Sequence, residues 1–196
     1  DIDLVISTVA LKPEGSVPVV RVSPFLNQQD IKAISRYAVR KSQNQSQVSL
    51  ILSDFIEPDL VFLDLEAISQ EQVIAFLAAR LEAKGVVSED YLAGVFARES
   101  LSSTAVGRGV AIPHTFQEHV HVSRVAVARL RNPIRWGAEE VDLVFLLALK
   151  FNREEKTWQM FRSFYRMLDN PQFLSRLRKS ENASQFVETI SGRREE

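Results

Sequence analysis

Residues 102–114 read Ser-Ser-Thr-Ala-Val-Gly-Arg-Gly-Val-Ala-Ile-Pro-His, and this stretch decides how the rest of the chain is interpreted. It places hydroxyl groups, two glycines and an arginine directly before one histidine, His114. Gly107 and Gly109 flank Arg108 and permit a tight turn whose backbone N–H groups can converge on an anion. A neutral imidazole nitrogen is a competent nucleophile towards a phosphoryl group. The stretch therefore predicts a phosphate-handling site in which His114 is the residue that becomes phosphorylated.

The neighbours of His114 supply the other groups of this predicted site. Ser103 and Thr104 carry hydroxyl donors, and Arg98, on a predicted helix, carries a planar guanidinium suited to phosphate oxygens. Pro113 fixes its own φ and restricts the residue before it, which orients the chain entering the imidazole. By spacing alone, an ordinary loop beside a surface histidine is an equally good interpretation, because one Gly-x-Gly is a weak signal. The predicted phosphate-binding residues are Ser103, Gly107, Arg108 and Gly109.

Composition excludes several classes of function. With 196 residues, 45% of them hydrophobic, the chain can bury a core for one ordinary domain and a smaller piece. A net charge of -1 gives no footprint for nucleic acid, so we expect this fragment to contact none. The absence of cysteine excludes disulfides and thiol chemistry and fits the cytoplasm. Apolar runs are shorter than the roughly 20 residues of a membrane helix, so no membrane contact is expected.

The pattern of apolar residues predicts an α/β fold in which helices flank a central mixed sheet. A nearly all-apolar run at 142–149 is typical of a strand that is buried on both faces. Ser69 and Gln72 match a capping box that opens a helix ending at Gly85. The other predicted strands are 3–8, 17–22, 60–65 and 122–130, and a turn is predicted at 132–137. A helix is predicted from Asn27 or Asp30 to about Arg40. The other predicted helices are 154–168 and segments starting near Ser88, Pro171 and Ser184.

The chain is expected to contain two parts. Residues 41–47 are polar and lack aromatic and β-branched side chains, as a linker does. We place the first part at 1–43, the linker at 44–50 and the main domain at 51–196. A part of about forty-five residues makes a marginal domain, so it should pack on the second part or be the end of a truncated one.

The stretch from Ser103 to His114, preceded by Arg98-Glu99, resembles the active-site signature of the EIIA type-2 (fructose–mannitol) domains of the bacterial phosphoenolpyruvate-dependent sugar phosphotransferase system. The resemblance covers about residues 48–191. It implies that His114 accepts a phosphoryl group from the phosphocarrier protein HPr and passes it to a cysteine of an EIIB domain. It further implies that Arg98 and Thr104 contact the phosphoryl group.

One position departs from the pattern of the family. Transporter-type domains of this family carry a second active-site histidine at the start of the helix after the apolar strand. This chain has Thr157 at the matching place. A threonine can donate a hydrogen bond to a phosphoryl oxygen, but it cannot carry the charge of an imidazolium. We therefore expect that His114 can still be phosphorylated, that onward transfer is slow, and that the domain is regulatory.

Residues 3–8 and 17–25 resemble the second half of an EIIB-like domain whose cysteine-bearing first half is missing. Such a half joined to an EIIA domain resembles the carboxy-terminal end of large sugar-responsive transcription activators and antiterminators. The chain begins with Asp1 and is interpreted as part of such a protein, with regulatory domains upstream. Two alternatives stay open, namely a transporter phosphocarrier and an interaction module whose histidine is never phosphorylated.

A metal site is a weaker interpretation. His114, His119 and His121 could be offered as zinc ligands, but their spacing fits no known motif and no cysteine helps. We expect no metal and no cofactor. Trp136 and Trp158 are expected to be packing residues.

Overall fold

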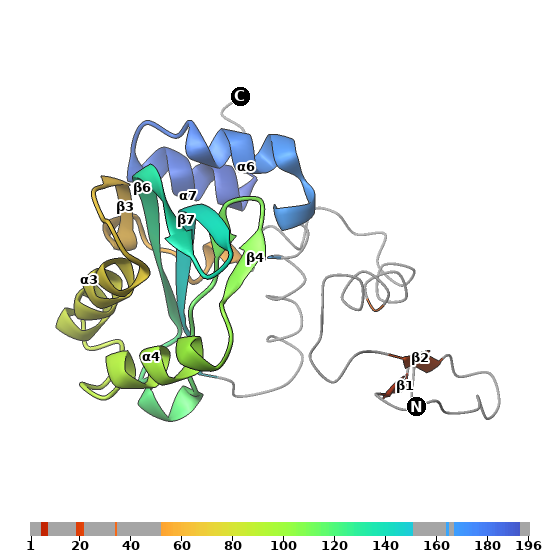
Figure 1. Cartoon of the computed structure of the whole chain (residues 1–196). Coiled ribbons are helices and arrows are strands. Elements are labelled where there is room, and N and C mark those ends of the chain that lie inside the picture. Colours follow the sequence, from red (N-terminus) through yellow and green to blue (C-terminus); the bar gives the residue numbers. More distant parts are fainter. Residues whose placement is uncertain are drawn as a thin grey trace. The chain divides into compact units, whose positions relative to one another are not determined.

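The computed structural model describes residues 5–7, 19–21, 34, 52–150, 164 and 167–192. The chain forms two compact units, Asp1–Gln45 and Ser46–Glu196. In the first unit, strand β1 (Val5–Ser7) pairs in parallel with β2 (Val19–Arg21), as Figure 1 shows. The helix predicted at 27–40 falls almost wholly outside the described residues.

The second unit is built on a five-stranded sheet (Figure 1). Parallel pairing joins β3 to β6 and β5 to β7, whereas antiparallel pairing joins β6 to β7 and β4 to β5. The sheet is therefore mixed, which confirms the predicted α/β class. The strands, in order across the sheet, are β3 (Val61–Leu65), β6 (Arg124–Trp136), β7 (Glu139–Ala148), β5 (Val110–Ala111) and β4 (Ala105–Gly107).

Side-chain caps fix where the helices begin. The hydroxyl of Ser69 accepts a hydrogen bond from the backbone of Gln72, as the predicted capping box requires. Asn170 caps the helix that begins at Pro171, and Asn182 caps the helix that begins at Ala183, in the same way. The described helices are α3 (Gln70–Ala83), α4 (Tyr91–Leu101), α6 (Pro171–Arg178) and α7 (Ala183–Ser191), with short 3-10 turns η1 (Pro58–Leu60) and η2 (Gln117–His119).

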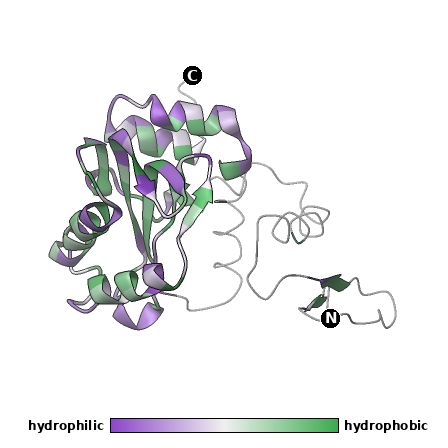
Figure 2. Ribbon diagram, viewed as in Figure 1, coloured by the Kyte–Doolittle hydropathy of each residue, from purple (hydrophilic) through white to green (hydrophobic). Residues whose placement is uncertain are grey.

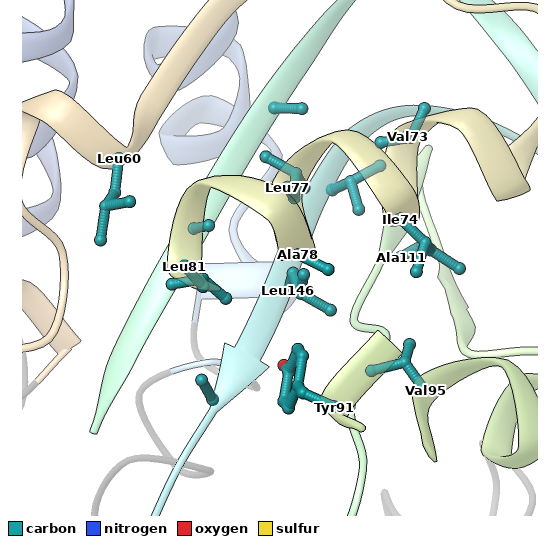
Figure 3. Packing of buried hydrophobic residues seen from close by; sticks show 14 of the residues in the cluster. Leu60, Val73, Ile74, Leu77, Ala78, Leu81, Tyr91, Val95, Ala111 and Leu146 are labelled. Carbon is teal, nitrogen blue, oxygen red and sulfur yellow. The ribbon is translucent and has the colours of Figure 1, made fainter. Parts of the chain in front are cut away.

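Helices cover both faces of the sheet, and β7 shows why. Its residues 143–148 are all buried, and alternate side chains enter two separate cores. Leu146 joins the core under α3 and α4, part of which is drawn in Figure 3. Phe145 joins the core under α6 and α7, where its ring meets that of Phe164 edge-on at 5.4 Å. Figure 2 shows the hydrophobic residues along the strands and the hydrophilic residues on outer faces of the helices.

Two local predictions were wrong. The turn predicted at 132–137 is mostly strand, because β6 continues to Trp136 and turns only at Gly137. The pairing of β6 with β7 is irregular between Arg129 and Ile134, and Pro133 lies in this interval. On the other side, β3 pairs with β6 only up to Leu130. Pro133 lacks an N–H, but it therefore interrupts no regular hydrogen bond of the sheet. The second error concerns the segment around Gly107 and Gly109. The predicted tight turn is present, but it joins two short strands, β4 and β5, that were not predicted.

The helix predicted at 154–168 lies mostly outside the described residues, although Phe164 and residues 167–169 are helical. Among the helices that the structure describes, none has the length and apolar character needed to cross a membrane.

Candidate functional site

The glycine turn (residues 107–109) connects β4 to β5 and is fastened by charged groups. Gly107, Arg108 and Gly109 all have positive φ, at 92°, 56° and 77°. Arg178 of α6 donates to both carboxylate oxygens of Asp142, at 2.6 and 2.7 Å, and to the carbonyl of Arg108 at 2.6 Å. A Cβ at position 109 would lie 2.6 Å from Asp142 Oδ1. Glycine is thus required by both the backbone conformation and the close approach of this ion pair.

The structure does not bring the glycine turn to His114. Beside β7, Val110 pairs with Leu143, whereas His114 pairs with Leu147. Positions four residues apart on one strand are about 13 Å apart, so the two ends of this segment are separated by about that distance. The expectation that backbone amides of the glycine turn hold a phosphoryl group on His114 is therefore corrected, because the turn and His114 lie at opposite ends of the extended segment beside β7.

His114 is half-buried, and its ring is fixed by one hydrogen bond. The Nδ1 atom lies 2.9 Å from the carbonyl oxygen of Ile112. A carbonyl oxygen can only accept, so Nδ1 carries the proton and Nε2 keeps a free lone pair in the neutral ring. The backbone is held as well, since Leu147 N donates to the carbonyl of Pro113 at 2.9 Å. The geometry therefore presents Nε2 as the nucleophilic atom.

The electrostatic surroundings keep this imidazole neutral. Burial is the largest influence and lowers the pKa of His114 below its ordinary value of 6.5. The bond to the Ile112 carbonyl acts in the opposite direction, the positive charge of Arg98 lowers the pKa further, and the negative charge of Glu99 raises it. The net effect is a lowered pKa, so the ring is neutral at pH 7.

Helix α4 forms one wall of the site. At its first turn, the hydroxyl of Tyr91 donates to the carbonyl of Leu147 at 2.9 Å, next to the His114 backbone. One turn later, a Cβ at Gly94 would lie 2.5 Å from Thr115 Oγ1, so the helix backbone packs directly against the residue after His114. A larger residue at position 94 would push these two segments apart.

Arg98 follows Gly94 by one helical turn and lies on the same face of α4. Its charge acts on the pKa of His114, which places the guanidinium within electrostatic reach of the imidazole. Its Nη1 donates to the carbonyl of Ser102 at 2.9 Å. A guanidinium has five N–H donors, and this bond uses one of them. Arg98 is therefore a positive charge near His114 whose remaining N–H donors are suited to binding an anion.

The hydroxyls of the motif are engaged elsewhere. Thr104 is buried, and its Oγ1 donates to Glu99 Oε2 at 2.6 Å, so the single hydroxyl proton already has an acceptor. Ser103 Oγ accepts from the backbone of Ala105 at 3.3 Å and packs against the turn at Gly137. Thr157 lies outside the described residues, so its predicted role stays a prediction.

Sequence reasoning did not assign a role to Glu99, which is the polar centre of this region. It is only 8% exposed, and its carboxylate accepts bonds from the backbone and hydroxyl of Thr104 and from the indole of Trp136. A signal was present, because position 99 continues the apolar spacing of Tyr91 and Val95 on α4. An acid at a core-facing helical position needs buried partners.

The other two histidines have different surroundings. A Cβ at Gly94 would lie 3.3 Å from His119 Cδ2, so His119 packs beside the same turn of α4. His119 Nε2 lies 3.5 Å from Glu118 Oε1, and His121 is exposed. Across the part of the chain that the structure describes, no group of three or more His, Cys, Asp or Glu side chains could hold a metal ion.

The fold and the site together define a class of small α/β domains built around one histidine that follows a short inner strand. A family model identifies the class further. Residues 54–192 match the model of the "Phosphoenolpyruvate-dependent sugar phosphotransferase system, EIIA 2", and the chain belongs to this family.

Curated relatives place this domain in longer proteins. The "Transcriptional regulator ManR" of Bacillus subtilis is 38% identical over 189 residues, which are 95% of this chain and 29% of that protein. The "Probable licABCH operon regulator" of the same organism is 30% identical over 96% of this chain and 28% of its own length. An Escherichia coli "PTS system 2-O-alpha-mannosyl-D-glycerate-specific EIIABC component" is 31% identical over 75% of this chain and 23% of its own. The chain thus spans less than a third of these relatives.

Solved structures show the same fold. The structure of "IIA mannitol from Escherichia coli" aligns with a TM-score of 0.61 and 24% identity, covering 68% of this chain and 97% of that one. The "Nitrogen Regulatory Protein IIA-Ntr from Neisseria meningitidis" aligns with a TM-score of 0.66 and 24% identity, covering 71% and 99%.

Proposed function

We propose that His114 accepts a phosphoryl group on Nε2 from the phosphotransferase system, and that the domain belongs to a sugar-responsive transcription regulator. The observation that carries this proposal is the neutral imidazole whose Nδ1–H is committed to the Ile112 carbonyl. That bond leaves Nε2 as the ring atom with a lone pair. Family membership supplies the chemistry in which such an atom is used.

In the proposed reaction, the Nε2 lone pair attacks the phosphorus in line with the bond to the donor. The nitrogen–phosphorus bond forms, the bond to the donor breaks, and its electron pair stays on the donor. The ring then carries a proton on Nδ1 and phosphorus on Nε2, so it becomes positively charged. The Ile112 carbonyl stabilises this charge by accepting from Nδ1–H, and Arg98 binds phosphoryl oxygens through its guanidinium.

The regulatory assignment is supported by the share of this chain that aligns with the two regulators from Bacillus subtilis. The regulators from Bacillus subtilis align with at least 95% of this chain, including residues before the start of the family match at 54. We propose that phosphorylation, which adds about two negative charges, changes contacts with regulatory domains upstream in the full-length protein. The EIIB-like nature of the first unit and a cytoplasmic location belong to this proposal.

Two partners follow from this proposal. HPr or an EIIB domain acts as the phosphodonor, and the upstream domains receive the signal. The solved "complex of enzyme IIAMTL and phosphorylated enzyme IIBMTL" of Escherichia coli contains a similar fold with a TM-score of 0.62, which supports an EIIB domain as a docking partner.

The test is to incubate the protein with phosphoenolpyruvate, enzyme I and HPr and to measure its mass. We expect one added phosphoryl group on the wild-type chain, none on His114→Ala, and one on the matched control His121→Ala, which changes an exposed histidine. Unchanged mass of the wild type would favour an interaction module and overturn the proposal.

A transporter phosphocarrier is the second candidate, because the Escherichia coli EIIABC component is 31% identical over 75% of this chain. Adding an EIIB protein to the phosphorylated domain separates the two functions. Rapid loss of the phosphoryl group to the EIIB cysteine supports the phosphocarrier. Slow loss, together with altered transcription by His114→Ala in the full-length protein, supports the regulator.

A further inference from the structure

We infer that Glu99 is a positioning residue that keeps the His114 ring in the tautomer with Nε2 unprotonated, acting through Thr104 and Ile112. This inference rests on the proposed function for its meaning, because the unprotonated Nε2 is the atom proposed to accept the phosphoryl group. The structural part of the inference concerns the ring alone and can be tested without any phosphoryl transfer.

The first step is the set of bonds around the Glu99 carboxylate. Oε1 accepts from the Thr104 backbone at 2.9 Å and from Trp136 Nε1 at 2.8 Å, and Oε2 accepts from the Thr104 hydroxyl at 2.6 Å. Trp136 is fully buried and Thr104 is 4% exposed. A buried carboxylate is costly unless its oxygens are hydrogen-bonded, and here three donors serve it. These bonds fix the position of Thr104 relative to α4 and β6.

The second step connects Thr104 to the histidine. The Thr104 carbonyl accepts a bond from Ile112 N at 3.1 Å, and the Ile112 carbonyl accepts from His114 Nδ1 at 2.9 Å. Hydrogen bonds therefore run without interruption from Glu99 through the backbones of two residues to the imidazole. Each bond sets the orientation of the next group.

The third step is that β4 needs this anchor. It is an edge strand of three residues, and it pairs only with β5 across an irregular register. The far end of the hairpin is fastened by Arg178 and Asp142. The end that carries Thr104 is fastened by Glu99. Without Glu99, the Ile112 carbonyl keeps the neighbouring bond from Leu147 to Pro113 but loses the support from Thr104. We infer that the ring can then turn or change tautomer.

The experiment measures the tautomer of His114 from the ring ¹⁵N shifts of the labelled chain, at pH 8, where a histidine with a lowered pKa is neutral. The wild type should show Nδ1–H and unprotonated Nε2. Glu99→Ala and Thr104→Val should show a mixture of both tautomers, whereas Thr104→Ser, which keeps the hydroxyl, should restore the wild-type spectrum. The matched control is Glu82→Ala, which removes an exposed acid from α3.

Each variant is first shown to be folded by circular dichroism, and Glu99→Gln, which keeps the shape of the side chain, replaces Glu99→Ala if the latter unfolds. Folded Glu99 and Thr104 variants with the wild-type tautomer overturn the inference. Phosphorylation by HPr is measured in parallel and should slow roughly tenfold in the same variants, as expected when a reacting group is misplaced. If the wild-type protein is never phosphorylated, the proposed function is wrong. The inference about Glu99 is then still tested by the tautomer measurement.

Discussion

The two ends of the segment formed by residues 107–114 are held by different interactions. The glycine turn is fastened by a bidentate ion pair between Arg178 and Asp142, and Arg178 also donates to the carbonyl of Arg108. At the other end, His114 is held by bonds to neutral backbone groups, and its Nε2 keeps its lone pair. The comparison shows that neighbouring residues of one motif have different surroundings. The glycines shape a hairpin, and the histidine keeps one ring nitrogen unprotonated, which is the atom proposed to be phosphorylated.

The largest effect is expected at the histidine end. His114→Ala should abolish phosphorylation completely, because it removes the ring nitrogen that is proposed to accept the phosphoryl group. The substitution should lower the free energy of unfolding by only about 1 kcal/mol, since it removes one hydrogen bond made by a half-buried ring. Mass spectrometry and urea denaturation measure the two quantities. A large loss of stability would contradict the division between the two ends.

The next effect is expected at the glycine end and concerns stability. Gly109→Ala combines a positive φ of 77° with a Cβ 2.6 Å from Asp142 Oδ1 and 2.8 Å from Arg178 Nη2. We expect a loss of about 2–5 kcal/mol in urea denaturation, from the left-handed conformation plus overpacking. The folded fraction should still be phosphorylated.

Gly85→Ala is the matched control for that change. Its φ is also positive, at 67°, but a Cβ there would meet nothing within 4 Å. It should therefore cost only the backbone penalty of about 1–2 kcal/mol. Equal losses for the two substitutions would show that the Arg178–Asp142 pair does not constrain the turn.

Arg98→Ala should slow phosphorylation of His114 while leaving the fold intact. A charge-assisted hydrogen bond to a phosphoryl group contributes about 1.5–3 kcal/mol, so the rate should fall roughly tenfold to a hundredfold. Removing the positive charge should also raise the pKa of His114. Stopped-flow kinetics and a histidine NMR titration measure the two effects. Arg108→Ala, at the glycine turn, is the matched control and should leave the rate unchanged.

The smallest effect is a dependence on pH. The folded-state pKa of His114 is lowered, so between that pKa and about 6.5 the unfolded chain binds more protons than the folded one. The contribution of His114 to stability is therefore complete above about pH 6.5 and is lost as the pH falls through the folded pKa. The difference in unfolding free energy between wild type and His114→Gln should shrink across that interval. A difference that grows as the pH falls would mean that the folded pKa is raised.

Much of the fold was predictable because periodicity and caps are local signals. The Ser69–Gln72 cap, the buried strand at 142–149 and the helix at Pro171 were all predicted from short stretches. The hairpin at residues 105–111 was interpreted as a loop, since its strands are too short to show alternation. Its register depends on Asp142 and Arg178, which lie far along the chain.

The site was predictable only in part. The motif indicated that Arg98 lies near His114, and the charge of Arg98 does lower the pKa of His114, whereas its contact with a phosphoryl group stays a prediction. The distance between the glycine turn and His114 was not predicted, because the spacing in the sequence does not reveal that the connecting residues are extended. The partners of Glu99 were not predicted, because one of its donors, Trp136, lies on a distant strand and no local pattern shows which partners a buried acid will find.

The Arg178–Asp142 pair also has a consequence for biosynthesis. Arg178 closes contacts with residues 36 and 70 positions earlier in the chain. The glycine turn therefore cannot be fastened by this pair while α6 is still inside the ribosome. Nascent chains stalled before residue 178 should carry a loose glycine turn, and release of α6 should fasten it late in synthesis.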